Sequence, residues 1–382
     1  MPWRSIGGQW RAVGGTWQGR KTPASLFENG EQGAWYDPSD LSTLFQDDAG
    51  STPVTEPGQT VGFVTDRSGN DKHATQATVE ARPIYGIVPA TGRRNLLDNT
   101  DLPGIQQNGS TQPDGSIQVG QVNIPVHQFT PDPVDGVVTG PGKSYPNAVG
   151  VDVTLSVFVL PKTNRYIYIS SNSLGTQPNV GTKYRYDTQT DAVVQLFDNN
   201  TLARSSRVEN LGNGLYRCTI SWRPRSTAGS KVFSVFCTNE LNDFPGSTRI
   251  SPADTTLALP FSHGGWQAEG LGDAALNPLP TPYQRVGSQF DVTEPGVRSL
   301  HYLFGDGVDD SLTATLPDIG AGATVAYATD QGVTILTGQT IGAGAYNILR
   351  DERLYAHLVI DRALTAQETA QVQVWLEEKA GI

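Results

Sequence analysis

The sequence contains only two cysteines and five histidines, and the histidines are widely scattered. A zinc site or a Ser-His-Asp triad built on them would have to assemble from distant segments. Cys218 and Cys237 could form a cross-strand disulfide, but a chain without a recognisable secretory signal is expected to fold in a reducing cytoplasm. We therefore expect two buried free thiols, and two isolated cysteines do not predict a metal site.

Long apolar segments and an excess of positive charge are also absent. No run approaches eighteen apolar residues and the N-terminus has no apolar core of a signal peptide, so neither membrane insertion nor secretion is expected. The formal net charge of -11 argues against a nucleic-acid partner, because binding to phosphates depends on clustered lysine and arginine.

Sequence motifs of common catalytic sites are missing as well. A glycosidase sandwich commonly supplies its paired carboxylates from one strand as Glu-x-Asp-x-Glu, and no such run occurs. Neither a Gly-x-Ser-x-Gly elbow, a phosphate-binding Gly-x-x-x-x-Gly-Lys-Ser/Thr loop nor a His-Glu-x-x-His helix is present. The sequence thus favours a protein that is not an enzyme.

What the chain does contain is typical of β-structure with many turns. It has 42 glycines and 25 prolines between short runs rich in Val, Ile, Thr and Tyr. Segments 151–159 and 165–169 alternate with period two, which predicts strands. Segments 215–222 and 231–237 are predicted to form a hairpin in which Cys218 lies opposite Cys237.

Two separated groups of motifs carry a family resemblance. The first group is 34–45 (AWYDPSDLSTLF), 66–70 (DRSGN), 73–76 (HATQ) and 81–83 (ARP), and the second is 302–312 (YLFGDGVDDSL). Together they resemble the concanavalin A-like (laminin-G-like) modules of tailed-phage and prophage tail proteins, where these motifs follow one another within one domain. The separation indicates that another module is inserted into a loop of the first.

The intervening segment carries its own motifs, namely 95–100 (NLLDNT), 154–159 (TLSVFV), 211–218 (LGNGLYRC), 265–270 (GWQAEG) and 281–283 (TPY). These resemble carbohydrate-binding-like jelly-roll modules of phage tail proteins, although the late motif differs from the family pattern in spacing by one residue. The predicted fold is all-β: two β-sandwich (jelly-roll) modules, one inserted in the other, with an extended N-terminal arm and a short C-terminal helix. The expected domains are an arm (1–30), a discontinuous concanavalin-like sandwich (31–93 plus 291–382) and an inserted jelly roll (94–290).

The end of the chain has clear helix signals. Thr365 and Glu368 are spaced as a capping box, Val372, Trp375, Leu376 and Lys379 follow at helical spacing, and Gly381 suits a C-terminal cap. The preceding segment 356–364 is predicted to be the last strand of the outer module, and the strand, the Asp-Arg-Ala-Leu-Thr run and the helix extend the same resemblance.

The N-terminal arm contains the only internal repeat, a seven-residue unit that begins with Trp-Arg and contains a Gly-Gly pair. The unit starts at Trp3-Arg4 and again at Trp10-Arg11, and Trp17 begins a third copy. Paired glycines disfavour a helix, so short strands joined by Gly-Gly turns are expected. The first 27 residues have four basic and no acidic side chains. We expect Trp3, Trp10, Trp17, Arg4 and Arg11 to attach the chain to other virion tail proteins, with self-packing of the tryptophans as the alternative.

Candidate ligand residues are few. Trp266, Tyr184, Tyr186 and Tyr145 could stack on sugar rings if they are exposed, while Trp35 and Trp375 are expected in the core. Asp306, Asp309 and Asp310 could offer oxygens to Ca²⁺, although aspartate beside glycine also suits a tight turn. No other cofactor is indicated.

These observations favour a virion structural protein of a tailed bacteriophage, in the tail fibre, tail tip or baseplate periphery. It would adhere to host cell-surface glycan, act as a homo-oligomer with a trimer favoured, and assemble in the bacterial cytoplasm. The alternatives are a polysaccharide-degrading tail enzyme and a decorative virion protein without a ligand.

Overall fold

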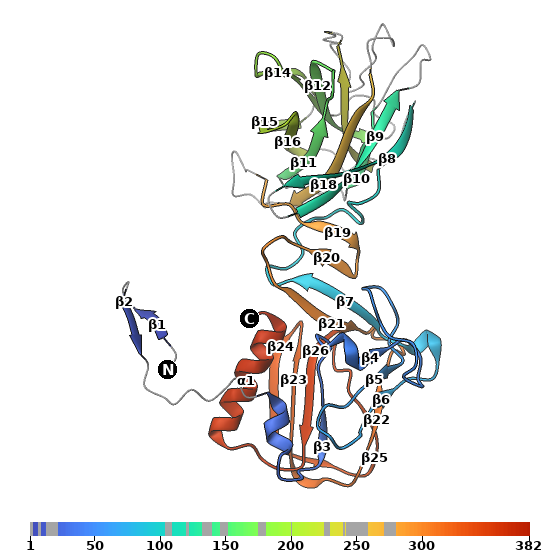
Figure 1. Cartoon of the computed structure of the whole chain (residues 1–382), viewed down its shortest axis with the longest axis vertical. Coiled ribbons are helices and arrows are strands. Elements are labelled where there is room, and N and C mark those ends of the chain that lie inside the picture. The colour runs from blue at the N-terminus through green and yellow to red at the C-terminus, as the bar shows by residue number, and fades with distance from the viewer. Residues whose placement is uncertain are drawn as a thin grey trace. The chain divides into compact units, whose positions relative to one another are not determined.

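The structure, a computed structural model, forms two compact units (Figure 1). The outer unit comprises Met1–Ala90 and Leu300–Ile382, and the inner unit comprises Thr91–Ser299. The boundaries expected from the sequence differ from these by three residues (93 against 90) and nine residues (290 against 299). The structure describes residues 3–6, 9–12, 22–103, 109–119, 122–131, 140–145, 152–174, 181–199, 201–224, 230–239, 241, 259–270 and 280–382.

The outer unit is a sandwich of two antiparallel sheets. Its larger sheet has the order β7-β21-β26-β23-β24, with β3 also paired to β26; the strands are β3 (Gly33–Tyr36), β7 (Ile84–Pro89), β21 (Ser299–Phe304), β23 (Gly320–Thr329), β24 (Gly332–Ile341) and β26 (Arg353–Ile360). Its smaller sheet has the order β25-β22-β6-β5-β4; the strands are β4 (Leu44–Phe45), β5 (Phe63–Val64), β6 (Ala74–Thr75), β22 (Thr313–Leu316) and β25 (Gly344–Asn347).

Both sheets of the outer unit join the two separated chain segments. β3 pairs with β26 in the register Tyr36 to His357, and β6 pairs with β22 in the register Ala74 to Ala314. The all-β character predicted from the sequence is confirmed, and residues on either side of the insertion share one hydrogen-bonded framework. Two short 3-10 helices, η2 (Leu41–Thr43) and η3 (Val79–Ala81), lie in its loops.

A single α-helix, α1 (Ala366–Ala380), closes the described part of the chain. Thr365 and Glu368 form the predicted capping box, and Gly381 ends the helix at φ 75°. Val372 and Leu376 are buried with residues of β26 in a core on the face of the larger sheet opposite the smaller sheet. No helix among the described residues is long and apolar enough to cross a membrane.

The inner unit is also a sandwich. The order β10-β17-β12-β13-β14 forms its five-stranded sheet, with β10 (Gly142–Tyr145), β12 (Tyr166–Leu174), β13 (Gly181–Asp187), β14 (Ala192–Asn199) and β17 (Ser230–Thr238). The order β15-β16-β11-β18-β9-β8 forms its six-stranded sheet, with β8 (Gly109–Val119), β9 (Val122–Pro131), β11 (Val153–Leu160), β15 (Thr201–Gly212), β16 (Leu215–Pro224) and β18 (Phe261–Gly270). A short ladder of β19 (Arg285–Ser288) and β20 (Asp291–Thr293) follows.

The predicted hairpin of 215–222 with 231–237 is wrong. β16 pairs with β15 and β11, whereas β17 pairs with β10 and β12 in the other sheet. Cys218 and Cys237 are both fully buried free thiols in the core between the sheets. The apolar residues of the two strands do face one another, but across the sandwich core rather than along a ladder.

The N-terminal arm is shorter than the predicted 1–30. Pro23–Phe27 form the 3-10 helix η1, and Leu26 and Phe27 are buried beside Trp35 and α1. Apolar side chains of this size gain most from burial, so they belong to the sandwich and not to an exposed tail. Further upstream, β1 (Trp3–Ile6) and β2 (Gln9–Ala12) pair antiparallel, with Trp3 opposite Ala12. Trp17 and the side chains of Trp3, Arg4, Trp10 and Arg11 lie outside the described structure.

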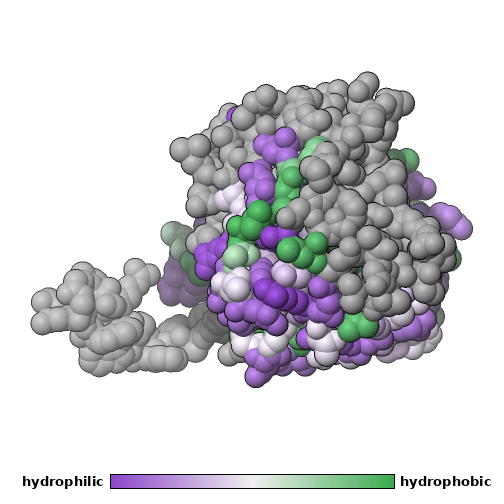
Figure 2. All heavy atoms as spheres, turned by 90° about the horizontal axis from the view of Figure 1, so that it is seen from above, coloured by the Kyte–Doolittle hydropathy of each residue, from purple (hydrophilic) through white to green (hydrophobic). Residues whose placement is uncertain are grey.

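Apolar and hydrophilic residues are intermixed on the described surface. On the face shown in Figure 2, apolar side chains form a short band bordered by hydrophilic ones.

The arm boundary can be tested by truncation. Removing residues 1–21 should leave the thermal unfolding temperature of the outer unit unchanged. Removing residues 1–27 should lower it by about 10 °C, because losing buried Leu26 and Phe27 costs about 3–6 kcal/mol. Differential scanning calorimetry measures both values, and equal unfolding temperatures for the two truncated proteins would contradict this boundary.

Candidate functional site

The four aromatic residues expected to stack on sugars are not available for that role. Trp266, Tyr184, Tyr186 and Tyr145 all belong to the core between the two sheets of the inner unit, with exposed fractions of 0 to 6%. Trp266, for example, packs edge-to-face on Phe233 at a centroid distance of 5.5 Å. Each ring occupies the inward-facing position of its strand, so the expectation that these residues form an exposed platform is wrong.

The acidic cluster of the outer unit is organised as a turn. The carboxylate oxygens of Asp306, Asp309 and Asp310 lie within 4.8 Å of one another. Asp306 accepts a hydrogen bond from the Val308 backbone N–H at 2.8 Å, and Asp310 accepts one from the Asp306 N–H at 2.9 Å. The first bond lowers the pKa of Asp306, while partial burial raises that of Asp310. These bonds account for Asp306 and Asp310 as turn residues, and the three carboxylates of the cluster fall short of the six to eight ligands that Ca²⁺ prefers.

A different candidate site lies on the outer face of the six-stranded sheet of the inner unit. Period-two alternation directs Val153, Leu155, Val157 and Val159 of β11 into the core, and therefore directs Phe158 to the opposite face. Phe158 forms a second apolar cluster there with Ile124, Leu215 and Tyr283.

Next to this cluster lies a groove with a volume of ≈ 500 Å³, which we call the inner groove. It is lined by Val119, Val122, Phe158, Glu209, Leu211, Arg217, Pro282, Tyr283, Pro295 and Gly296.

Arg217 is the cation that lines the inner groove. Its guanidinium donates hydrogen bonds to Ser156 Oγ at 3.2 Å and to the Thr281 carbonyl at 2.9 Å, and lies 5.3 Å from the ring centroid of Phe158. Its buried Nε has no hydrogen-bond partner among the described residues. Burial lowers the pKa of Arg217, against the attraction of Glu269 and Glu209. The groove thus combines an apolar wall with an unused buried donor.

A glycine allows the apolar wall to close across β18. Gly265 has φ 59°, and a Cβ at this position would lie 2.7 Å from the Phe158 ring and 2.9 Å from Ile124. Phe158 and Ile124 can therefore meet across the strand only because residue 265 has no side chain.

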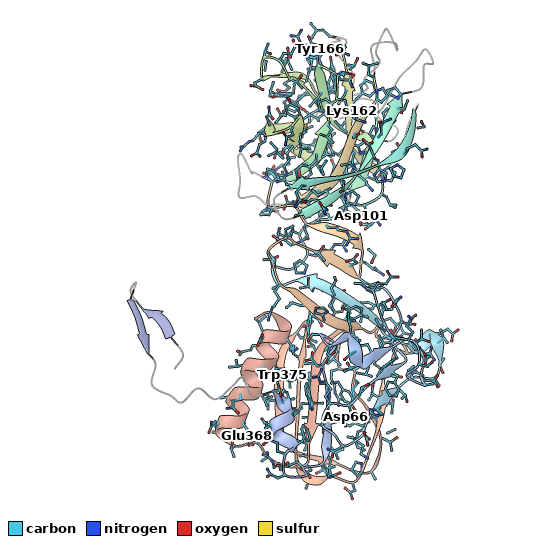
Figure 3. All side chains as sticks on the ribbon, viewed as in Figure 1. Asp66, Asp101, Lys162, Tyr166, Glu368 and Trp375 are labelled. Carbon is cyan, nitrogen blue, oxygen red and sulfur yellow. The ribbon has the colours of Figure 1, made fainter. Side chains whose placement is uncertain are left out.

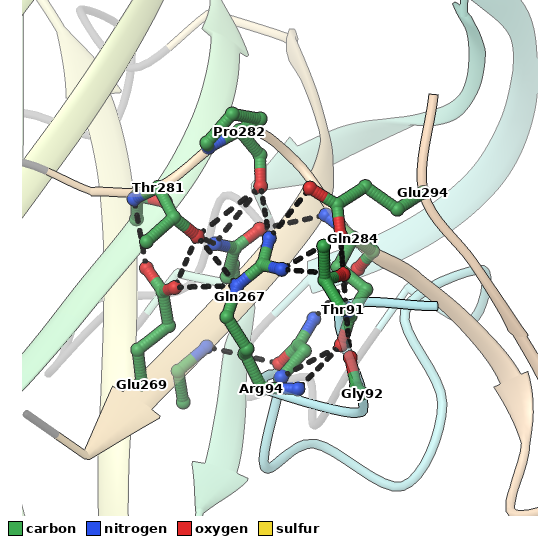
Figure 4. Close-up of polar contacts among 12 residues, drawn as sticks. Thr91, Gly92, Arg94, Gln267, Glu269, Thr281, Pro282, Gln284 and Glu294 are labelled. Carbon is green, nitrogen blue, oxygen red and sulfur yellow. Dashed lines mark hydrogen bonds and ion pairs between the residues drawn. The ribbon is translucent and has the colours of Figure 1, made fainter. Parts of the chain in front are cut away.

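A buried polar network fixes the chain that borders the groove (Figure 4). Arg94 donates two hydrogen bonds to Glu294, at 2.6 and 2.9 Å, and its Nε donates to Thr281 Oγ at 3.2 Å. Glu269, 2% exposed, accepts from the backbone N–H and the hydroxyl of Thr281. We call Arg94, Glu269, Thr281 and Glu294 the clasp. The clasp fixes the position of Thr281, which immediately precedes the groove residues Pro282 and Tyr283 in the sequence.

The clasp also defines the charge state of its carboxylates. Burial acts to raise the pKa of Glu294, but the hydrogen bonds from Arg94 and Thr91 outweigh it, so this pKa is lowered. The same pairing raises the pKa of Arg94. Glu294 is therefore an ionised structural partner of Arg94 at neutral pH, and it is not a candidate general acid.

Sequence reasoning identified the motifs around this site but not the site itself. The segments 211–218 and 281–283 that carry the family resemblance contribute Leu211, Arg217 and Tyr283 to the groove. The alternation of side chains along β16 could have indicated Arg217. Every second residue of this strand lies in the core, so Arg217 must point to the opposite face; the core residues are Tyr216, Cys218, Ile220 and Trp222.

No protein-family model matches the sequence, and no curated protein matches it significantly. The resemblance to phage tail modules accordingly rests on the motifs alone.

The clasp predicts a specific stability defect. Arg94→Met should destabilise the inner unit by about 3 kcal/mol at pH 7, because Glu294 and Glu269 would remain buried without their cation. The defect should shrink as the pH falls, because protonation of Glu294 removes the uncompensated charge. The native protein should respond to pH in the opposite way. Because the pKa of Glu294 is lowered, its contribution to the stability of the native protein is present above the ordinary glutamate pKa and is lost as the pH falls through the lowered pKa.

Calorimetry at pH 7 and pH 4 measures both effects. Arg207→Met serves as the control, since Arg207 is 51% exposed and lies 4.0 Å from Glu209, and it should change stability little. An Arg94→Met defect that is independent of pH would argue against an ionic role for the clasp.

Proposed function

We propose that this chain is an adhesive structural protein of a tailed-phage particle and that the inner groove binds host-surface glycan. In this proposal the N-terminal arm attaches the chain to other tail proteins, and the inner unit presents the groove. A homo-oligomer, with a trimer favoured, would present several copies at once and so strengthen weak contacts through avidity.

The observation that carries glycan binding is the guanidinium of Arg217, whose Nε has no partner among the described residues, in the lining of a mainly apolar groove. A hydrogen bond from a charged guanidinium to a ligand oxygen contributes about 1.5–3 kcal/mol. Sugars offer apolar C–H faces together with hydroxyl or carboxylate oxygens, which match the apolar wall and the guanidinium. The guanidinium favours an acidic residue such as a uronate, because the lining carboxylate Glu209 has a 46% exposed side chain and solvent screens its charge.

The same residues favour binding over hydrolysis. Retaining glycosidases place two carboxylates about 5 Å apart, and Glu209 is the sole carboxylate that lines the groove in the described part of the chain. The buried carboxylates of Glu269 and Glu294 are occupied by Thr281, Thr91 and Arg94. A groove of this composition can hold a saccharide but offers no paired acid and base.

Binding to purified bacterial surface polysaccharides, uronate-containing and neutral, tests the proposal. Arg217→Met should weaken binding of the uronate-containing polymer at least about tenfold, because it removes the donor and the charge. Arg185→Met is the matched control, since Arg185 also lies over an aromatic ring, Tyr166, at 5.5 Å, but on the five-stranded sheet. Titration calorimetry gives the affinities, and thermal unfolding confirms that each variant is folded.

Unchanged affinity in Arg217→Met would contradict the proposed site. Release of reducing ends during the incubation would instead favour the polysaccharide-degrading alternative, and binding to none of the polymers would favour the decorative one.

A further inference from the structure

The outer unit has a second groove, which we call the helix groove, with a volume of ≈ 550 Å³. It is lined by Thr22, Trp35, Asp37, Arg67, Gln367, Ala370, Gln371, Val374, Trp375, Glu378 and Lys379. Trp375 projects from α1 (Figure 3) and packs edge-to-face on Trp35, with ring centroids 5.8 Å apart. Trp375 is only half-buried, so part of its ring surface remains accessible.

The helix groove contains a buried donor without a partner. Trp35 is 3% exposed, and its Nε1 has no hydrogen-bond partner in the part of the chain that the structure describes. Buried indole N–H groups are normally hydrogen-bonded. Trp35 is thus a residue of the groove wall whose polar atom the described part of the protein leaves unsatisfied.

The charges that line the helix groove balance. Arg67 lies 4.8 Å from the Trp35 ring centroid and is ion-paired with Asp40, and Lys379 donates to Asp37 at 2.6 Å. The lining itself carries two cations, Arg67 and Lys379, and two carboxylates, Asp37 and Glu378, which sum to zero. A neutral ligand is therefore favoured over a charged one.

Gln367 and Gln371 add amide groups that both donate and accept, on the exposed side of α1. Aromatic surface, planar polar groups and paired donors and acceptors suit a molecule with apolar C–H faces and many hydroxyls. A volume of ≈ 550 Å³ lies within the range of about 300–1,000 Å³ typical of small-molecule sites.

We propose that the helix groove is a second binding site that takes an uncharged mono- or disaccharide. The ligand packs on Trp375 and exchanges hydrogen bonds with Gln367 and Gln371. This site is independent of the inner groove and differs from it in selecting neutral sugars.

The test uses the full-length protein and a panel of glucose, galactose, mannose, N-acetylglucosamine and their disaccharides, with galacturonate as the charged probe. Saturation-transfer NMR and titration calorimetry should detect binding of at least one neutral sugar and weaker binding of galacturonate. Trp375→Ala should reduce the neutral-sugar affinity at least about tenfold. Ala370→Arg, which fills the groove from an exposed helical position, should do the same without disturbing the core.

Two controls separate this site from other effects. Tyr346→Ala removes a half-buried aromatic residue of the same unit that also lies beneath an arginine, Arg350 at 4.9 Å, and should leave the affinity unchanged. Arg217→Met should likewise have no effect, so that failure of the inner groove and failure of the helix groove are distinguishable. The proposal is overturned if no neutral sugar binds, if binding survives in both groove variants, or if galacturonate binds more tightly.

Discussion

The outer unit depends on the pairing of β26 with strands from both ends of the chain. β26 is bonded to β3 from the N-terminal segment and to β21 and β23 from the C-terminal segment. Its side chains supply both cores of the unit, with Val359 on one face and Leu358 on the other. Such non-local pairing carries a loop-closure cost that grows slowly with length. The inner unit limits this cost because Arg94 and Glu294 hold its own ends together.

Local sequence patterns predicted where helices and strands form better than they predicted which strands pair with one another. The capping box at Thr365 and the strands around 151–159 and 165–169 followed from helix signals and period-two alternation, both of which are short-range. The pairing of β16 with β17 was wrong because alternation identifies the buried face of a strand but not its neighbours. In a sandwich, strands of opposite sheets bury their side chains in one core. Cys218 and Cys237 therefore both occupy inward-facing positions although their strands are not hydrogen-bonded to each other.

The candidate sites were less predictable. Whether a side chain faces the core or the solvent depends on its position in the alternation along the strand, and residue type indicates this poorly. Trp266 and Tyr184 are residues that stack on sugars, yet both occupy inward positions and stabilise the core. Trp35 and Trp375 were expected in the core, and Trp35 is buried while Trp375 remains half-exposed in a groove. Leu26 and Phe27 were assigned to the arm because of their position in the sequence. Their burial depends on α1, more than three hundred residues away, which no local pattern could indicate.

Unpartnered buried polar atoms support a binding proposal only where their residue lines a groove. Trp266 Nε1 and both ring nitrogens of His263 also lack hydrogen-bond partners among the described residues, but Trp266 is fully enclosed in the inner core and His263 packs against it at 5.4 Å. Burial lowers the pKa of His263 to about 3, so the ring stays neutral and costs less to leave unpaired than a charge would. Arg217 and Trp35 also have an unpartnered buried nitrogen, but both residues line a groove. The two binding proposals therefore rest on residues that line open volume, whereas a ligand could contact Trp266 or His263 only by opening the core between the sheets.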